Sequence, residues 1–349
     1  MLIERVAQLL VLMLFVVNGY PAMADSQDIP ARVSDKSSVN RLTAVARTPQ
    51  GLVAVGPWGR ILLGDAAGNR WQQVPVPVSS DLVAVNFPDA VNGWAVGHDG
   101  VILHSQDGGQ SWSKQLDGRQ LGKLLTEYYE PRVARGEVDA SVMDSVDRMV
   151  TDGPNMPWLN VSFSDARNGL VVGAFNLALM THDGGQTWIP LLERTANPEG
   201  MHLYGLARSG ADLYLAGERG LLRRWNQSRN TFEPLPTPYR GTFFGLSANG
   251  NTLIAHGLRG NAFASHDRGD HWQRIETGAD ASITASATLA DGSLVLASQS
   301  GQLMVSDPAE NTFAPMTPAR SMPYFGIAAG PGRSVIAVGP YGVRVETIK

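Results

Sequence analysis

Residues 82–112 read LVAVNFPDAVNGWAVGHDGVILHSQDGGQSW, and they carry the pattern from which the rest of the chain can be interpreted. Three short runs rich in Val, Leu and Ile (LVAVNF, GWAVG and VILHS) are separated by turn residues such as Asp, Asn and Gly. Runs of this length between turn residues predict β-strands. The stretch ends in the motif S-x-D-x-G-x-x-W, after which a fourth strand closes a small antiparallel unit.

The same unit recurs along the chain. A β-type run ends in glycine, and an aromatic residue follows 15 positions later, at Gly56/Trp71, Gly97/Trp112, Gly173/Trp188, Gly217/Phe232 and Gly257/Trp272. Ser298/Phe313 keeps the spacing with serine in place of glycine, and Gly339 marks a seventh unit. Successive units are separated by 41, 76, 44, 40, 41 and 41 residues, so one interval holds about 35 extra residues. A period near 40 with four strands per unit is typical of β-propeller blades.

We therefore predict an all-β fold, a seven-bladed β-propeller that occupies residues 25–349 as a single domain. The extra residues form an insertion at about 116–157, between blades two and three. The last unit has only three strand-like runs. We expect the extended stretch at 29–34, IPARVS, to pair with the last blade and close the ring, because an open ring would leave unpaired strand edges.

The insertion carries apolar residues at helical spacing, Val138, Val142, Val146 and Met149, with aspartates on the other side. A first helix is expected from about Leu121, ending before Pro131. We predict a helical hairpin. Two interpretations of its apolar stripe stay open: a lid that packs on the ring, and a contact surface for a partner.

Three blades carry the complete S/T-x-D-x-G-x-x-W motif, the Asp-box. The aspartate is expected to accept backbone N–H bonds in the turn between the third and fourth strands, and the glycine to adopt a conformation that is costly for other residues. The tryptophan is expected to pack between blades. A structural role is therefore favoured over a catalytic one for Asp107, Gly109, Trp112, Asp183, Gly185, Trp188, Asp267, Gly269 and Trp272.

Composition restricts the function classes. The chain has 32 acidic and 28 basic residues and a net charge of −4, which argues against a nucleic-acid partner. There is no cysteine, so disulfides, thiolate metal sites and a cysteine nucleophile are excluded. The seven histidines lack metal-site spacing. We expect no metal and no cofactor.

Residues 1–24 have the layout of a secretory signal peptide. The apolar run at 9–17 follows Arg5, and Ala22-Met23-Ala24 supplies small residues for cleavage. The run is shorter than the roughly 20 apolar residues of a membrane-spanning helix. We expect cleavage after Ala24 and an exported, periplasmic monomer, with an uncleaved anchor as the alternative.

Seven Asp-box units behind such a leader, with blades like residues 82–112, resemble the photosystem II assembly/stability factor family, which lies within the wider sialidase-like Asp-box (BNR) propellers. The resemblance covers essentially the whole chain after residue 24. It implies a non-enzymatic scaffold or assembly factor outside the cytoplasm. The partner that it implies is a membrane protein or membrane complex of the cell envelope, or the precursor of one.

The alternative is a glycan-binding or glycan-cleaving propeller. A sialidase needs an arginine triad, one member of which usually lies in Arg-Ile-Pro, and no such tripeptide occurs. A glycosidase needs two carboxylates across a cleft. Asp99, Asp165 and Glu218 are candidates, but no spacing singles out a pair.

The loops between the second and third strands of the blades lie on one face, together with the links between blades. They present arginine and aromatic residues, which are common interface anchors. We predict a partner-binding rim, with solvated turns as the alternative, made of Trp58, Arg60, Phe175, Arg219, Arg259 and Tyr341. Its three arginines are expected to be exposed and to attract an acidic or phosphate-bearing segment.

Overall fold

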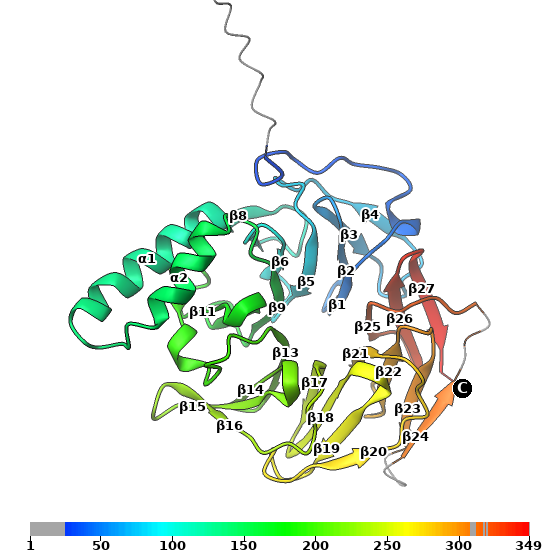
Figure 1. Cartoon of the computed structure of the whole chain (residues 1–349). Coiled ribbons are helices and arrows are strands. Elements are labelled where there is room, and N and C mark those ends of the chain that lie inside the picture. The colour runs from blue at the N-terminus through cyan, green and yellow to red at the C-terminus, as the bar shows by residue number, and fades with distance from the viewer. Residues whose placement is uncertain (1–24, 308–311, 317, 319, 349) are drawn as a thin grey trace, which may run out of the picture.

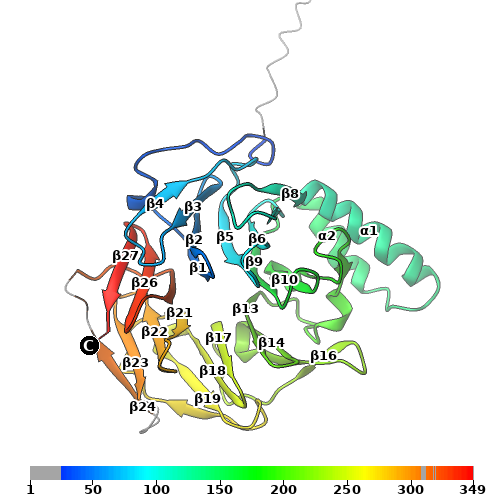
Figure 2. The ribbon, with the colours of Figure 1, turned by 180° about the vertical axis from the view of Figure 1, so that it is seen from behind.

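A computed structural model describes residues 25–307, 312–316, 318 and 320–348, so the expected signal peptide lies outside the described residues. The strands of this part of the chain form seven antiparallel sheets around a central axis (Figures 1 and 2). Six sheets have four strands and the last has three. The predicted seven-bladed β-propeller is confirmed.

Each blade runs from the axis outward in chain order, except for the missing fourth strand of blade seven. Blades one to three are β1 (Ala44–Thr48), β2 (Gly51–Gly56), β3 (Arg60–Gly64) and β4 (Trp71–Gln73); β5 (Leu82–Asn86), β6 (Gly93–Gly97), β7 (Ile102–Ser105) and β8 (Ser113–Leu116); β9 (Trp158–Phe163), β10 (Gly169–Gly173), β11 (Ala178–Thr181) and β12 (Ile189–Pro190).

The remaining blades follow without a long interruption. They are β13 (Leu203–Ser209), β14 (Asp212–Gly217), β15 (Leu222–Asn226) and β16 (Thr231–Pro234); β17 (Phe243–Asn249), β18 (Thr252–Gly257), β19 (Ala262–Ser265) and β20 (Gln273–Ile275); β21 (Ile283–Thr288), β22 (Leu294–Ser298), β23 (Leu303–Asp307) and β24 (Thr312–Met316); β25 (Gly326–Ala329), β26 (Ser334–Gly339) and β27 (Gly342–Thr347).

The core is divided into layers between blades. Every residue of β2, β6 and β10 is buried. These second strands read as continuous apolar runs because a neighbouring blade covers each face. One such layer joins blades two and three through Trp94, Trp158 and Phe163.

The prediction that residues 29–34 pair with the last blade is wrong. These residues form no strand, and blade seven has three strands. The segment lies instead along blade one, where the Ala31 amide donates to Val76 O over 3.0 Å. The ring closes by direct packing of blade seven on blade one, and Leu42 N donates to Gly339 O over 3.0 Å. The short helix η1 (Ser37–Val39) contacts both β27 and β4.

The insertion is a helical hairpin, as predicted, made of α1 (Gly118–Ala134) and α2 (Val142–Thr151) (Figure 1). The expectation that the first helix stops before Pro131 is wrong, because α1 includes Pro131 and ends one turn later. Val146 and Met149 are buried against the layer between blades two and three. Val138 and Val142 are partly buried against the same cluster, which includes Leu121 and Leu125 of α1, so α1 and the ring together cover the apolar stripe of the insertion. Over the described ranges, no helix is long and apolar enough to span a membrane.

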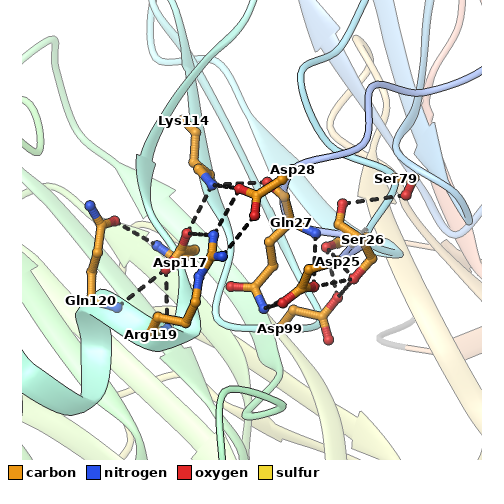
Figure 3. A network of polar contacts seen from close by, with 11 residues as sticks. Asp25, Ser26, Gln27, Asp28, Ser79, Asp99, Lys114, Asp117, Arg119 and Gln120 are labelled. Atoms are coloured by element: carbon orange, nitrogen blue, oxygen red, sulfur yellow. Dashed lines mark hydrogen bonds and ion pairs between the residues drawn. The ribbon is translucent and has the colours of Figure 1, made fainter. Parts of the chain in front are cut away.

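A cluster of hydrogen bonds and ion pairs fastens the start of α1 to the segment that begins at Asp25 (Figure 3). Arg119 contacts both oxygens of Asp28, at 2.7 and 2.9 Å, and contacts Asp117 at 2.7 Å. Lys114 Nζ donates to Gln27 O and to Asp117, each at 2.8 Å. Residues 25–28, Lys114, Asp117 and Arg119 are called the clasp below.

Candidate partner-binding face

The loops between the second and third strands of the blades share an unusual backbone geometry. Five of them turn through two consecutive residues with positive φ, at Trp58-Gly59, Asp99-Gly100, Phe175-Asn176, Arg219-Gly220 and Arg259-Gly260. Turns of this kind favour Gly or Asn at both positions. A larger residue in the left-handed region costs roughly 1–2 kcal/mol. Bulky side chains therefore stand at positions where local structure favours small ones.

Five of the six predicted rim residues are exposed. Trp58, Phe175 and Tyr341 are 70%, 45% and 64% exposed. Arg219 and Arg259 are exposed as well. Arg219 contacts Glu199 at 2.6 Å, in a pair whose side chains are both largely in solvent. Such a pair contributes little to stability, so Arg219 can exchange Glu199 for a partner's carboxylate at small cost.

Arg60 is not a rim residue, which corrects the prediction. Its side chain is buried, and Nη1 donates to Arg41 O over 3.0 Å. Arg60 follows its blade glycine by four positions, whereas Trp58, Arg219 and Arg259 follow theirs by two. It therefore lies in β3, paired with Gly56, and not at the tip of the turn.

The same face holds the mouth of the central channel, a groove of about 540 Å³. Its lining includes Leu159, Tyr204 and Phe244, which lie at the beginning of inner strands, and Phe325, which directly precedes β25. In blades four and five the ladder is irregular at Tyr204 and Phe244, so these residues have no partner in the register. A bulged residue is re-aimed relative to its neighbours.

An aromatic track connects this mouth with the rim. Phe175 meets His202 edge to face, with ring centroids 4.6 Å apart, and Tyr204 meets Phe244 in the same way at 5.5 Å. On the other side of the mouth, the Arg41 guanidinium lies over Phe325, 5.4 Å from the ring centroid. Burial, reinforced by the nearby Glu218 carboxylate, raises the pKa of Tyr204. Its phenol therefore stays neutral and able to donate a hydrogen bond.

The sequence interpretation missed the aromatic residues of the channel mouth. A signal was present, because two large residues in succession stand at the start of several inner strands or directly before it: Trp158-Leu159, Leu203-Tyr204, Phe243-Phe244 and Tyr324-Phe325. The first of each pair is buried between blades. The second lines the channel.

The three candidate acids of a glycosidase belong to separate networks. Asp99 accepts hydrogen bonds from Ser26 and Ser80, at 2.6 and 2.7 Å. Glu218 accepts from the His202 amide at 2.8 Å. Asp165 lies in the first hairpin of blade three, on the opposite face, where it accepts from the amides of Arg167 and Asn168. The structure thus brings no pair of them together across a cleft. In the part of the chain that the structure describes, no group of three or more His, Asp or Glu side chains is placed to hold a metal ion.

The Asp-box residues form three equivalent turns on the opposite face. Asp107 accepts from the Ser111 amide at 2.9 Å, and Asp183 and Asp267 make the corresponding contacts at the same distance. Gly109, Gly185 and Gly269 all have φ between 83° and 97°. Trp112 and Trp188 are buried between blades, whereas Trp272 is only partly buried.

These features define the class of the protein: a seven-bladed Asp-box propeller with an open, aromatic-lined channel mouth. The model of the family described as photosynthesis system II assembly factor YCF48 matches residues 63–125 and 150–323. The chain belongs to this family. The stretch between the two matched segments lies within the helical insertion.

Two curated relatives are named as photosystem II assembly factors. The photosystem II assembly lipoprotein Ycf48 of Synechococcus sp. (strain CC9902) is 23% identical over 246 residues, which are 69% of this chain and 63% of that relative. The chain thus spans slightly less than two thirds of it. The chloroplastic photosystem II stability/assembly factor HCF136 of Cyanidioschyzon merolae (strain NIES-3377 / 10D) is 30% identical over 102 residues, 28% of this chain and 22% of that one. These names denote assembly factors, which is consistent with a non-enzymatic protein.

Among solved structures, one described as YCF48 bound to D1 peptide has the same fold. It superposes with a TM-score of 0.65 at 15% sequence identity, and the match covers 92% of this chain and 99% of that one. At this identity the likeness establishes the architecture.

Proposed function

We propose that this protein is an exported, non-enzymatic assembly factor whose second-hairpin face binds a segment of an envelope membrane protein or of its precursor. The observation that carries the proposal is the convergence of exposed aromatic and arginine side chains on one face. Trp58, Phe175 and Tyr341 are exposed on its rim, and Tyr204 and Phe244 line its channel mouth.

The chemistry of this face suits an extended polypeptide. Aromatic side chains and arginine are the residues that most often anchor protein interfaces. The channel mouth offers a recess with both aromatic and polar lining for a large side chain. Arg41 at its edge and Arg219 and Arg259 on the rim can meet carboxylates. The strained turns support a binding role, because bulky residues persist there at a cost to local stability. The relative described as bound to a D1 peptide supports a peptide ligand.

The location is part of the proposal. A signal peptide cleaved after Ala24 would place the chain in the periplasm, and a relative named as a lipoprotein supports export. The clasp holds residues 25–28 in the folded domain directly after the expected cleavage site. Mass spectrometry of the mature protein is expected to find Asp25 as the first residue.

Affinity capture from solubilised membranes tests the binding face. Arg219→Ala/Arg259→Ala and Tyr204→Ala/Phe244→Ala variants are compared with Arg229→Ala/Arg274→Ala, which removes two exposed arginines from other parts of blades four and five. The face variants are expected to lose a captured membrane protein while keeping the melting temperature of the folded domain. Each lost anchor is expected to weaken binding by about 1–2 kcal/mol or more.

Rim charges are screened over about 8–10 Å at ordinary ionic strength, so capture is also expected to weaken with salt. Wild-type capture by both folded face variants would contradict the proposed face. Recovery of only soluble glycans or glycoproteins would favour the alternative of a glycan-binding propeller.

A further inference from the structure

A second groove, of about 310 Å³, lies on the Asp-box face between blades three and four. Its lining combines one arginine, one tryptophan and several amide or imidazole side chains: Asn168, His182, Arg208, Trp225, Gln227 and Asn230. The channel mouth opens on the other face, so the two sites are separate.

The groove exists because blade four departs from the pattern of the blades before it. Phe87 and Phe163 each lie five residues after the first buried residue of their inner strand, and Arg208 has the same position after Leu203. Phe163 stacks on Trp94 with ring centroids 3.5 Å apart and fills the space between blades two and three. In blade four a guanidinium replaces this aromatic ring, and the Asp-box tryptophan is replaced by Phe232.

The guanidinium of Arg208 is half-buried and has few partners. Within the described residues it makes one hydrogen bond, from Nε to Ser162 Oγ over 3.2 Å. Arg223, on the same blade, makes three bonds to backbone carbonyls. Burial lowers the pKa of Arg208, and the Asp165 carboxylate acts in the opposite direction. The two Nη groups of Arg208 are not enclosed by the protein, so they face the groove and can donate to a ligand.

Asp165 does not form an ion pair with Arg208, because its carboxylate accepts the hydrogen bonds of its own turn. It accepts hydrogen bonds from the amides of Arg167 and Asn168 at 2.7 and 2.9 Å, and from the Asn168 side chain at 2.9 Å. These bonds, foremost those of Asn168, hold the pKa of Asp165 at about 2.

We propose that this groove binds the carboxylate of a small ligand of monosaccharide size, with Arg208 as the bidentate anchor. A guanidinium fork matches a carboxylate in geometry and charge. Trp225 offers an aromatic wall, and the side chains of His182 and Gln227 at the edge suit ligand hydroxyls. A volume of about 310 Å³ is about ten times the share of one water molecule in the liquid, enough for one sugar ring.

The test is titration calorimetry with D-glucuronate, D-glucose and a tripeptide in two forms, with a free and with an amidated C-terminus. Glucuronate is expected to bind and glucose not to bind, because only the former carries a carboxylate. Binding of glucuronate alone supports a sugar acid. Equal binding of the free-acid tripeptide, with no binding of the amide, supports the same carboxylate site filled by a chain end.

Arg208→Gln is the matched variant, because it removes the guanidinium and keeps a polar side chain at the edge of the groove. It is expected to preserve the melting temperature and to weaken glucuronate binding at least tenfold. Arg229→Ala, which removes an exposed arginine from the same blade, is expected to leave binding unchanged. Absence of carboxylate binding to the wild-type protein, or equal affinity in Arg208→Gln, would overturn the proposal. Either result leaves membrane-protein capture by the opposite face untouched.

Discussion

The hydroxyl at the first position of each Asp-box organises the turn as much as the aspartate does. Ser105 Oγ accepts the Gly109 amide at 2.8 Å and donates to Asp107 at 2.9 Å. Thr181 and Ser265 make the same pair of contacts. The hydroxyl is buried in each case, so it links the strand to the turn where water cannot compete.

Trp112 is expected to contribute strongly to stability. It is 7% exposed, meets Phe87 edge to face, and donates from Nε1 to Gly109 O over 2.9 Å. Trp112→Ala is expected to lower the free energy of unfolding by about 3–5 kcal/mol, because a large buried side chain is lost. Trp272→Ala is expected to cost less, since that ring is partly exposed. Denaturant titrations of both variants check this order, and equal small effects would contradict it.

His256 gives stability a defined pH dependence. Its ring is fully enclosed beside Gly245, and burial lowers its pKa to about 4. Between pH 6.5 and 4, His256 is protonated in the unfolded chain but stays neutral in the folded chain. The free energy of unfolding therefore falls as the pH drops from 6.5 to 4, and then levels off. The loss is about 3 kcal/mol.

The difference between wild type and His256→Leu isolates this effect, because His104 is also buried and shifts in the same direction. The difference in unfolding free energy between the two proteins is expected to change across pH 6.5 to 4 and to be constant from pH 7 to 8. A constant difference over the whole range would show that His256 does not titrate as described.

The position of single residues could be predicted where the local repeat fixes it. The Asp-box turns follow from their spacing, because each motif closes its own hydrogen bonds. The kind of residue alone could not place Arg60. It lies two positions beyond the tip of the turn, and this difference moves its side chain from the rim into strand β3. Tyr204 and Phe244 depend on bulges, which change the direction of a side chain without changing its sequence pattern.

At the scale of elements, the clasp fixes where the helical hairpin begins. Asp117 is the N-cap of α1. Its carboxylate accepts hydrogen bonds from the amides of Arg119 and Gln120, and its own backbone amide donates to Gln120 Oε1 over 3.1 Å. Burial acts to raise the pKa of Asp117, but the contacts with Arg119 and Lys114 outweigh it and lower the pKa to about 2. The charged carboxylate therefore stabilises the fold above about pH 4, and this contribution is lost as the pH falls towards 2.

Asp117→Asn is the variant that isolates the charge, because asparagine remains a good N-cap. It is expected to lower stability at pH 7 by about 1–2 kcal/mol and to accelerate amide exchange in the first turn of α1. Glu127→Gln is the control on the same helix, since the Glu127–Lys123 pair is exposed and 3.7 Å long. Equal exchange rates in both variants would show that the clasp does not hold the hairpin.

The elements that sequence interpretation placed wrongly are those held by long-range contacts. The stretch at 29–34 has the composition of a strand, but its backbone bonds to the side chain of Gln73 in blade one. Ser34 N donates to Gln73 Oε1, and Gln73 Nε2 donates to Arg32 O. Helix α1 continues past Pro131 because Tyr129 and Arg132 both bond Glu193, which anchors its last turn to the link between blades three and four. Neither contact has a local signature.

For the whole molecule, the ring separates two faces with different chemistry. The Asp-box face is built from turns that satisfy their own hydrogen bonds and, between blades three and four, a groove with an arginine. The second-hairpin face presents strained turns, exposed aromatic residues and the channel mouth. The number of blades could be predicted because a repeat of about 40 residues is visible along the chain. The surfaces between blades could not, because they depend on which residues of different repeats meet.

The clasp limits the open part of the rim. Blade two has Asp99 where other blades have Trp58, Phe175, Arg219 or Arg259, and Asp99 binds Ser26 and Ser80. The first residues after the expected cleavage site therefore occupy the rim at blade two. The aromatic and basic positions stay accessible on blades one, three, four, five and seven.

The central claim, that the second-hairpin face binds a membrane protein, is tested most directly by site-specific photocrosslinking in intact cells. A photoreactive phenylalanine analogue is placed at Phe175 on the rim and, in a second protein, at Val91, an exposed apolar residue on the opposite face. We expect the Phe175 position to form a crosslink to one membrane protein and the Val91 position to form none. Crosslinks to the same membrane protein from Val91 alone would contradict the account.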